Sequence, residues 1–167
     1  NSGNGIDLTG GFGVDTIFLS KKCESLIYCE RNEDLASLVT HNFKALNQDN
    51  CEVYVGDGVE YLKNLKKIDL IFVDPSRRKE SQRIYRLEDC EPNVIDLIGL
   101  FFDKAERVLI KTAPLLDIRQ TLSDLEAVKE VHVIAVNNDC KEVVYHLEKD
   151  FTGETQIFCV NLKKKNK

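Results

Sequence analysis

The stretch Asp7-Leu8-Thr9-Gly10-Gly11-Phe12-Gly13-Val14-Asp15 decides the fold, because it joins an apolar strand to a helix through a glycine-rich turn. Residues 5–8 are predicted as a short buried strand, and the apolar spacing of residues 14–22 predicts a helix. Glycines at such a turn let the backbone approach a ligand closely and leave helix N–H groups free to bind it.

The residues around this turn limit the kinds of ligand that it can bind. A dinucleotide-binding turn needs a third glycine where Thr16 stands, so a pyrophosphate fits the turn less well. The acid Asp7, placed before the glycines, suits a ligand with a cationic amino-acid end. A tight turn with a purely structural role is the alternative.

Strands and helices alternate along the rest of the chain. The further predicted strands are 26–29, 52–55, 68–73, 107–111, 131–136, 143–147 and 156–162. The further predicted helices are 33–46 with Asn32 as N-cap, 59–65, 92–104 and 116–125. This alternation predicts an α/β domain with a parallel sheet and right-handed crossovers, whose ligands bind at the carboxyl ends of the strands.

Composition and charge exclude several classes of protein. The 167 residues are enough for one domain, and no apolar stretch approaches the roughly 20 residues that a membrane helix needs. We therefore expect no membrane contact. The six cysteines include no CxxC pair, so we also expect reduced thiols in a cytoplasmic protein and no metal site. The net charge of −5 argues against a protein that binds nucleic acid with its whole surface, although a local basic patch could do so. Because the chain starts without Met just before a central strand, we expect a fragment of a longer protein with neighbouring domains.

Two more acids follow predicted strands. Glu30 stands 17 residues after Gly13, where a carboxylate can accept both hydroxyls of a ribose; a solvent-facing acid is the alternative. Asp57, followed by Gly58, stands where a carboxylate can accept a hydrogen bond from an adenine amino group. An N-cap role for Asp57 is the alternative, and the two roles can coexist.

The strand 68–73 ends in Asp74-Pro75-Ser76-Arg77-Arg78, which puts an acid beside paired guanidinium groups. Guanidinium planes stack on bases and pair with phosphate, so the arginine-rich segment 77–86 is predicted as a phosphate-contacting lip, with a solvated loop as the alternative. Lys111 ends the next strand and is expected to face the same edge of the sheet.

The ordered acids and glycines resemble the class I S-adenosylmethionine-dependent methyltransferases over essentially the whole chain. More narrowly, "DLTGGFGVDT", "DPSRR" and "IKTAP" look like a bacterial subgroup that carries a THUMP-like C-terminal segment, which is absent here. The resemblance implies a Rossmann-like, doubly wound, mostly parallel seven-stranded sheet with an antiparallel C-terminal hairpin. The β-rich ending matches but offers one more strand-like run than expected. Residues 1–162 would form the methyltransferase domain and residues 163–167 a basic tail.

The resemblance also assigns roles to residues. The methionine end of S-adenosyl-L-methionine would lie at Asp7, Thr9, Gly10, Gly11 and Gly13, its ribose at Glu30, and its adenine at Asp57 and Gly58. Asp74 and the carbonyl of Pro75 would receive the target group, and the substrate would contact Ser76, Arg77, Arg78 and Lys111. Related amino-methyltransferases have a second proline and an aromatic residue where Ser76 and Arg77 stand, and this departure weakens the assignment of an exocyclic amine.

We therefore predict an S-adenosylmethionine-dependent methyltransferase that acts on an RNA base. THUMP domains elsewhere bind RNA, which points in the same direction. Methylation of uridine C5 would need a cysteine nucleophile after the fifth strand, where Ile110-Lys111-Thr112-Ala113-Pro114 has none. A small-molecule or protein methyltransferase and a non-catalytic cofactor-binding docking module stay open as alternatives. An NAD-binding domain is disfavoured by the missing third glycine and by Asp57.

Overall fold

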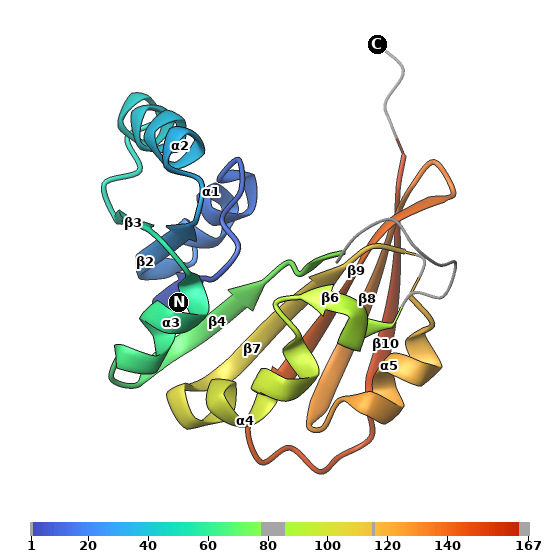
Figure 1. Ribbon diagram of the computed structural model, residues 1–167. Helices are drawn as coiled ribbons and strands as arrows, with labels where there is room; N and C mark the ends of the chain where they lie inside the picture. Colours follow the sequence, from blue (N-terminus) through green and yellow to red (C-terminus); the bar gives the residue numbers. More distant parts are fainter. Residues whose placement is uncertain (1, 78–85, 115, 164–167) are drawn as a thin grey trace. The chain divides into compact units, whose positions relative to one another are not determined.

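The computed structural model describes residues 2–77, 86–114 and 116–163, with Ser2 and Arg77 described by their backbone alone (Figure 1). The chain forms two compact units. Unit 1 comprises Asn1–Val73 and Leu100–Glu106, and unit 2 comprises Asp74–Gly99 and Arg107–Lys167. No helix among the described residues is long and apolar enough to cross a membrane.

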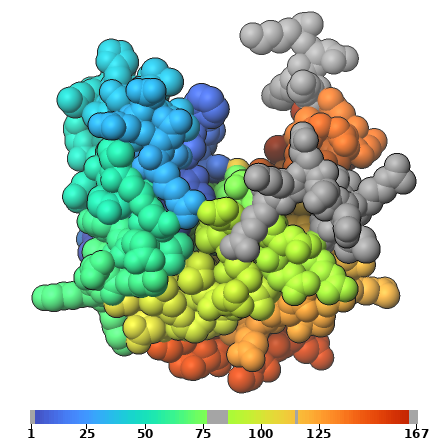
Figure 2. All heavy atoms as spheres, in the orientation of Figure 1, coloured from blue at the N-terminus to red at the C-terminus, as the bar shows by residue number. Residues whose placement is uncertain are grey.

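Unit 1 is built on a parallel sheet with the strand order β4-β1-β2-β3. Its strands are β1 (Ser2–Asp7), β2 (Cys23–Glu30), β3 (Cys51–Val55) and β4 (Ile68–Val73). Its helices are α1 (Val14–Ser20), α2 (Glu33–Ala45) and α3 (Gly58–Asn64), and Figure 2 shows side chains of α2 and α3 at its surface. Because all four strands run the same way, their carboxyl ends share one edge.

The core of unit 1 forms where α2 packs on the sheet. Tyr28, Ala36, Val39 and Phe43 make one buried cluster, and the rings of Tyr28 and Phe43 meet edge to face with centroids 5.6 Å apart. Asn32 caps α2 as predicted, because its side chain accepts a hydrogen bond from the Leu35 N–H at 3.0 Å. This core supports the turn that connects β1 to α1.

Unit 2 contains the antiparallel part of the fold, with the strand order β7-β9-β8-β10. The strands are β7 (Ala105–Thr112, which begins in unit 1), β8 (Val128–Val136), β9 (Asp139–Glu148) and β10 (Gln156–Leu162). Strand β9 is antiparallel to β7 and β8, whereas β10 is parallel to β8. Asn137 and Asn138 both have positive φ, which is typical of the tight hairpin turn that joins β8 to β9.

The remaining elements of unit 2 are short. They are β5 (Ser76–Arg77), the 3₁₀ helix η1 (Leu87–Asp89), β6 (Cys90–Glu91), α4 (Val94–Lys104, which ends in unit 1) and α5 (Ile118–Asp124). Strands β5 and β6 pair antiparallel in a small separate sheet. Helix α4 begins two residues after Pro92, and the Asn93 side chain accepts a hydrogen bond from the Ile95 N–H at 3.1 Å.

The structure confirms the mixed α/β sheet and the antiparallel C-terminal hairpin. The expected count of seven strands is wrong, because the strand order contains eight strands among the described residues. The additional strand is β10, which pairs in parallel with β8 beyond the hairpin. The β5–β6 pair was not predicted either, since strands of two residues are too short to show a periodic pattern.

Candidate cofactor and acceptor sites

Asp7 ends β1 and is almost completely buried, with 1% of its surface exposed. One carboxylate oxygen, Oδ1, accepts the Thr9 N–H at 3.0 Å, and Oδ2 accepts the Thr16 hydroxyl at 2.6 Å. Thr16 lies on α1 and is itself fully buried. The carboxylate therefore fastens the start of the glycine turn to the helix that follows it. Thr16, which the sequence showed only as a missing glycine, is a partner of Asp7.

Tyr28 of β2 lies directly under the glycine turn. A Cβ atom at Gly10 would approach the ring of Tyr28 to 2.1 Å, so only glycine fits at this position. The Tyr28 hydroxyl donates to the carbonyl oxygen of Gly11 at 2.5 Å. Burial, with the negative charges of Glu30 and Asp7, raises the pKa of Tyr28 well above its usual value, so its hydroxyl stays protonated as a donor. Sequence analysis did not identify Tyr28.

Gly11 and Gly13 give the turn its shape. Their φ angles are +51° and +73°, a left-handed conformation that L side chains rarely adopt. A Cβ atom at Gly13 would also come within 2.7 Å of Val39 in the core, whereas one at Gly11 would meet only the Thr9 carbonyl oxygen, at 3.8 Å. Gly13 therefore serves packing as well as conformation, and Gly11 conformation alone.

Glu30 ends β2 and is half-buried. Its Oε2 accepts the Gly11 N–H at 3.0 Å, and its Oε1 accepts the Asn32 N–H at 2.8 Å. The carboxylate thus connects the glycine turn to the start of α2. Each oxygen carries a second lone pair, so this fixed carboxylate can still accept hydrogen bonds from a ligand.

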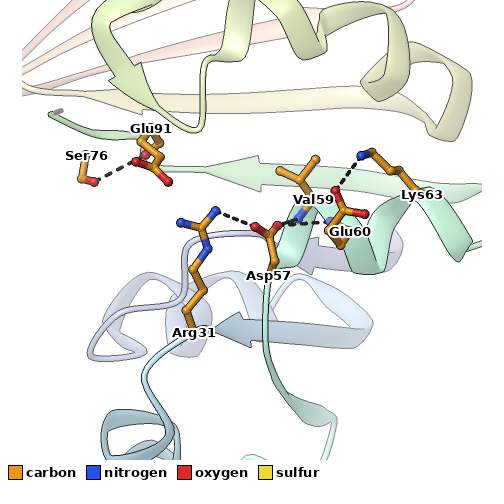
Figure 3. A network of polar contacts seen from close by, with 7 residues as sticks. All are labelled: Arg31, Asp57, Val59, Glu60, Lys63, Ser76 and Glu91. Atoms are coloured by element: carbon orange, nitrogen blue, oxygen red, sulfur yellow. Dashed lines mark hydrogen bonds and ion pairs between the residues drawn. The ribbon is translucent and has the colours of Figure 1, made fainter.

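Asp57 follows β3 and caps α3 (Figure 3). Its Oδ1 accepts the N–H groups of Val59 and Glu60 at 2.8 and 3.1 Å, and its Oδ2 accepts Nη2 of Arg31 at 2.6 Å. Burial raises the pKa of Asp57, but the Glu60 N–H, the Arg31 guanidinium and the Val59 N–H outweigh it, and the pKa lies below its usual value. The N-cap alternative is therefore confirmed.

Two further residues belong beside Asp57. Arg31 was not identified from the sequence, although its place directly after Glu30 at the end of β2 was a possible signal. Gly58 lies so close to the residue that follows β1 that an added Cβ would come within 2.5 Å of the Leu8 carbonyl oxygen. This close packing fixes the start of α3.

The buried thiol of Cys29 lies near the acids at the strand ends. Burial, followed by the negative charges of Asp7 and then Asp57, raises the pKa of the Cys29 thiol to about 12. Glu30 and Asp7 act in the same direction on neighbouring Tyr28. Unit 1 therefore brings together all three acids that the sequence predicted for a cofactor.

Unit 2 contains the predicted acceptor residues. Asp74, the first residue after β4, pairs with Lys111 of β7, with 3.0 Å between Oδ2 and Nζ. The Lys111 side chain is only 17% exposed and that of Asp74 is 39% exposed, so the pair is partly shielded while the carboxylate stays accessible. Pro75 is half-buried beside it. The structure thus joins two residues that lie 37 positions apart in the sequence.

The predicted substrate residues after Pro75 are only partly described. Ser76 lies in β5, and its hydroxyl makes a long hydrogen bond of 3.4 Å to the Glu91 carbonyl oxygen in β6 (Figure 3). The backbone of Arg77 pairs with that of Cys90. Arg78 and the other predicted cations before Arg86 lie outside the described residues, as does the end of the basic tail after Lys163. Arg86 is exposed and pairs with Glu88 at 3.1 Å.

The described residues contain no group of three or more histidines, cysteines or acids placed to bind a metal ion. The six cysteines, which all lie among the described residues, form no disulfide bond, and Cys23, Cys29 and Cys90 are buried. The donor set at the strand ends is made of carboxylates and backbone groups, which suits an organic ligand with amino and hydroxyl groups.

No family model matches the chain. Among curated proteins, it is 26% identical over 130 residues to a protein-L-isoaspartate O-methyltransferase of Nitrobacter winogradskyi, a match that covers 78% of this chain and 60% of that protein. It is 32% identical over 76 residues to ribosomal RNA small subunit methyltransferase J of Bdellovibrio bacteriovorus, which covers 42% of this chain and 30% of that protein. The chain thus spans less than two thirds of these relatives.

Solved structures extend the comparison. A proposed methyltransferase from Porphyromonas gingivalis W83 matches with a TM-score of 0.80 and 36% identity, over 89% of this chain and 37% of that one. TrmK of M. capricolum in complex with S-adenosyl-homocysteine matches with a TM-score of 0.66 and 13% identity, over 98% of this chain and 67% of that one, which shows a shared fold. These proteins are methyltransferases by their names, and the chain shares its fold with structures that were solved in complex with S-adenosyl-homocysteine.

Proposed function

We propose that this protein transfers the methyl group of S-adenosylmethionine to a base of RNA. The observation that carries this proposal is the acceptor pair, in which Lys111 fixes the partly exposed carboxylate of Asp74 at 3.0 Å. A carboxylate in this state can accept an N–H of a base and orient its nitrogen. The Pro75 carbonyl, next in the chain, supplies a second acceptor.

Methyl transfer needs few catalytic groups from the protein. The acceptor nitrogen attacks the methyl carbon as the carbon–sulfur bond breaks, the sulfur keeps the electron pair, and the nitrogen loses a proton to solvent. The thioether that leaves is neutral and needs no protonation, so alignment and exclusion of water supply most of the catalysis. An acid that orients the N–H is sufficient for this step.

The cofactor roles follow the order of the strand ends in unit 1. Asp7 and the turn of Thr9, Gly10, Gly11 and Gly13 bind the methionine end, because a fixed buried acid lies beside backbone that a ligand can approach. Glu30 accepts the ribose hydroxyls through the lone pairs that the Gly11 and Asn32 N–H groups leave available. Asp57, with Gly58, accepts the adenine amino group.

The RNA substrate is supported by two kinds of observation. One curated relative is a ribosomal RNA methyltransferase, and a Streptococcus thermophilus structure described as an rRNA methylase shares the fold with a TM-score of 0.60. In the sequence, Arg77 and Arg78 follow the acceptor residues after Ser76, where guanidinium groups could contact phosphates or stack on bases. We propose that they contact the RNA backbone.

A protein substrate is the second candidate. The protein-L-isoaspartate O-methyltransferase, which matches 78% of this chain, methylates proteins by its name, and the net charge of −5 does not favour a polyanionic substrate. A substrate carboxylate would, however, meet the carboxylate of Asp74, and the Lys111 cation is already paired with that acid, which makes this candidate the weaker one.

The test is transfer of a tritiated methyl group from S-adenosylmethionine to total RNA and, separately, to total protein. We expect label in RNA that survives digestion to nucleosides as a modified base. The Asp74→Asn variant should lose the transfer and retain S-adenosylhomocysteine binding, whereas Asp139→Asn, which changes an exposed acid elsewhere in unit 2, should retain both. Label only in protein would establish the second candidate. Binding without transfer to either fraction would indicate a docking module.

A further inference from the structure

Strand β10 is an unusual edge strand. It lies at the end of the strand order in unit 2 with β8 as its described neighbour, and all seven of its residues are exposed. Its large apolar side chains include Ile157, Phe158, Val160 and Leu162, which are 55, 40, 43 and 54% exposed. The segment Gln156–Leu162 contains no charged residue and no proline. A long uncharged edge of this kind is a template for pairing with another strand.

The outer side of β10 has a defined hydrogen-bonding pattern. The Leu162 carbonyl accepts the Asn137 N–H at 2.9 Å and so faces β8. Because N–H and C=O groups alternate in direction along a strand, Ile157, Cys159 and Asn161 direct theirs to the opposite, outer side. Cys159 is the middle residue of β10 and is exposed.

The pattern fits a second copy in antiparallel orientation. With Cys159 opposite Cys159 of the other copy, Ile157 and Asn161 exchange hydrogen bonds across the pair. The same register places Phe158 opposite Val160 on one face, an aromatic and β-branched combination that stabilises paired strands.

The charges beside β10 favour the same orientation. Glu154 stands before the strand and Lys163 after it, and both are exposed. Antiparallel copies bring Lys163 of each chain alongside Glu154 of the other, whereas parallel copies would align lysine with lysine. A partner strand of unrelated sequence would share this complementarity only by chance.

We propose that β10 is a self-association surface, through which two copies of this chain pair antiparallel about Cys159. One pair of strands buries less than the roughly 800 Å² per partner of a standard stable interface, so the dimer forms in a concentration-dependent manner. This surface lies on the outermost strand of unit 2, and the proposed association does not depend on the methyl-transfer reaction.

The test is sedimentation equilibrium over a wide range of protein concentration under reducing conditions. We expect the average mass to rise from that of one chain toward that of two. Cys159→Lys places two lysines opposite each other at the centre, and we expect it to weaken association about tenfold or more. Leu38→Lys, which changes an exposed apolar residue of α2 in unit 1, is the matched control and should associate normally.

Oxidative cross-linking with copper–phenanthroline tests the register separately. A covalent dimer that disappears in Cys159→Ser supports the pairing about Cys159, because residues directly opposite in an antiparallel pair are close enough for a disulfide. A monomer at every concentration would overturn the proposal. Association that persists in Cys159→Lys would overturn it as well, since another surface would then be responsible.

Discussion

The buried contact between Thr16 and Asp7 gives the sharpest stability prediction. The Thr16 hydroxyl donates to Asp7 Oδ2 at 2.6 Å, and the two residues are 0 and 1% exposed. Thr16→Val replaces the hydroxyl with a methyl group of similar size and leaves a buried carboxylate oxygen without this donor. Hydrogen bonds to charged groups contribute about 1.5–3 kcal/mol, so the free energy of unfolding should fall by about 2–3 kcal/mol. For a chain of this length the melting temperature should fall by roughly 4–12 °C.

Urea unfolding followed by circular dichroism measures the effect, with Thr16→Ser as the matched control. Thr16→Ser keeps the donor and loses one methyl group, at a cost of about 1 kcal/mol. Thr16→Val should therefore be the less stable variant by at least 1 kcal/mol, with the same dependence on urea concentration. Equal stabilities would refute the conclusion that this hydrogen bond fastens the glycine turn to α1.

Three further predictions follow from the two sites. Gly10→Ala should lower the free energy of unfolding by about 3 kcal/mol or more, because its Cβ would come within 2.1 Å of the buried Tyr28 ring. Gly11→Ala should lower it by only about 1–2 kcal/mol, because of the positive φ at this position. Equal losses of stability in thermal unfolding would contradict this difference. The pKa of Asp57 is below its usual 3.8 in the folded protein, so its stabilising effect is complete above that pH and is lost as the pH falls through the lower folded value. Acid unfolding of Asp57→Asn should therefore depend less on pH below about 4 than that of the wild type. Asp74→Asn should abolish methyl transfer and leave S-adenosylhomocysteine affinity within twofold, and a matching loss of affinity would place Asp74 in the cofactor site instead.

The alternation of strands and helices could be predicted from the sequence because each element carries its own periodic pattern. The strand-end acids could be predicted for the same reason, since parallel strands place their carboxyl ends at one edge. Asn32 as a helix cap is a local signal of the same kind, and the structure confirms it. The pairing of Asp74 with Lys111 was expected only as a shared edge, and the structure supplies the 3.0 Å contact.

The contacts that hold the glycine turn could not be predicted in this way. Thr16 and Tyr28 act through partners that lie 9 and 17 residues away in the chain, and their roles depend on tertiary packing. The ion pair of Arg31 with Asp57 joins residues that lie 26 positions apart in the chain, so the local sequence does not indicate it. Strand β10 was predicted as a strand, but its parallel pairing with β8 depends on a connection whose path leaves no local signal.

The most direct test of the cofactor site is calorimetry with S-adenosylhomocysteine on the intact chain, on Glu30→Ala and on Asp57→Ala. Glu24→Ala, which changes an exposed acid at the other end of β2, is the control. We expect one molecule bound per chain, with affinity at least tenfold weaker in the two site variants and unchanged in the control. Absence of binding by the folded wild-type protein, or binding that neither site variant weakens, would contradict a cofactor site built from the strand-end acids.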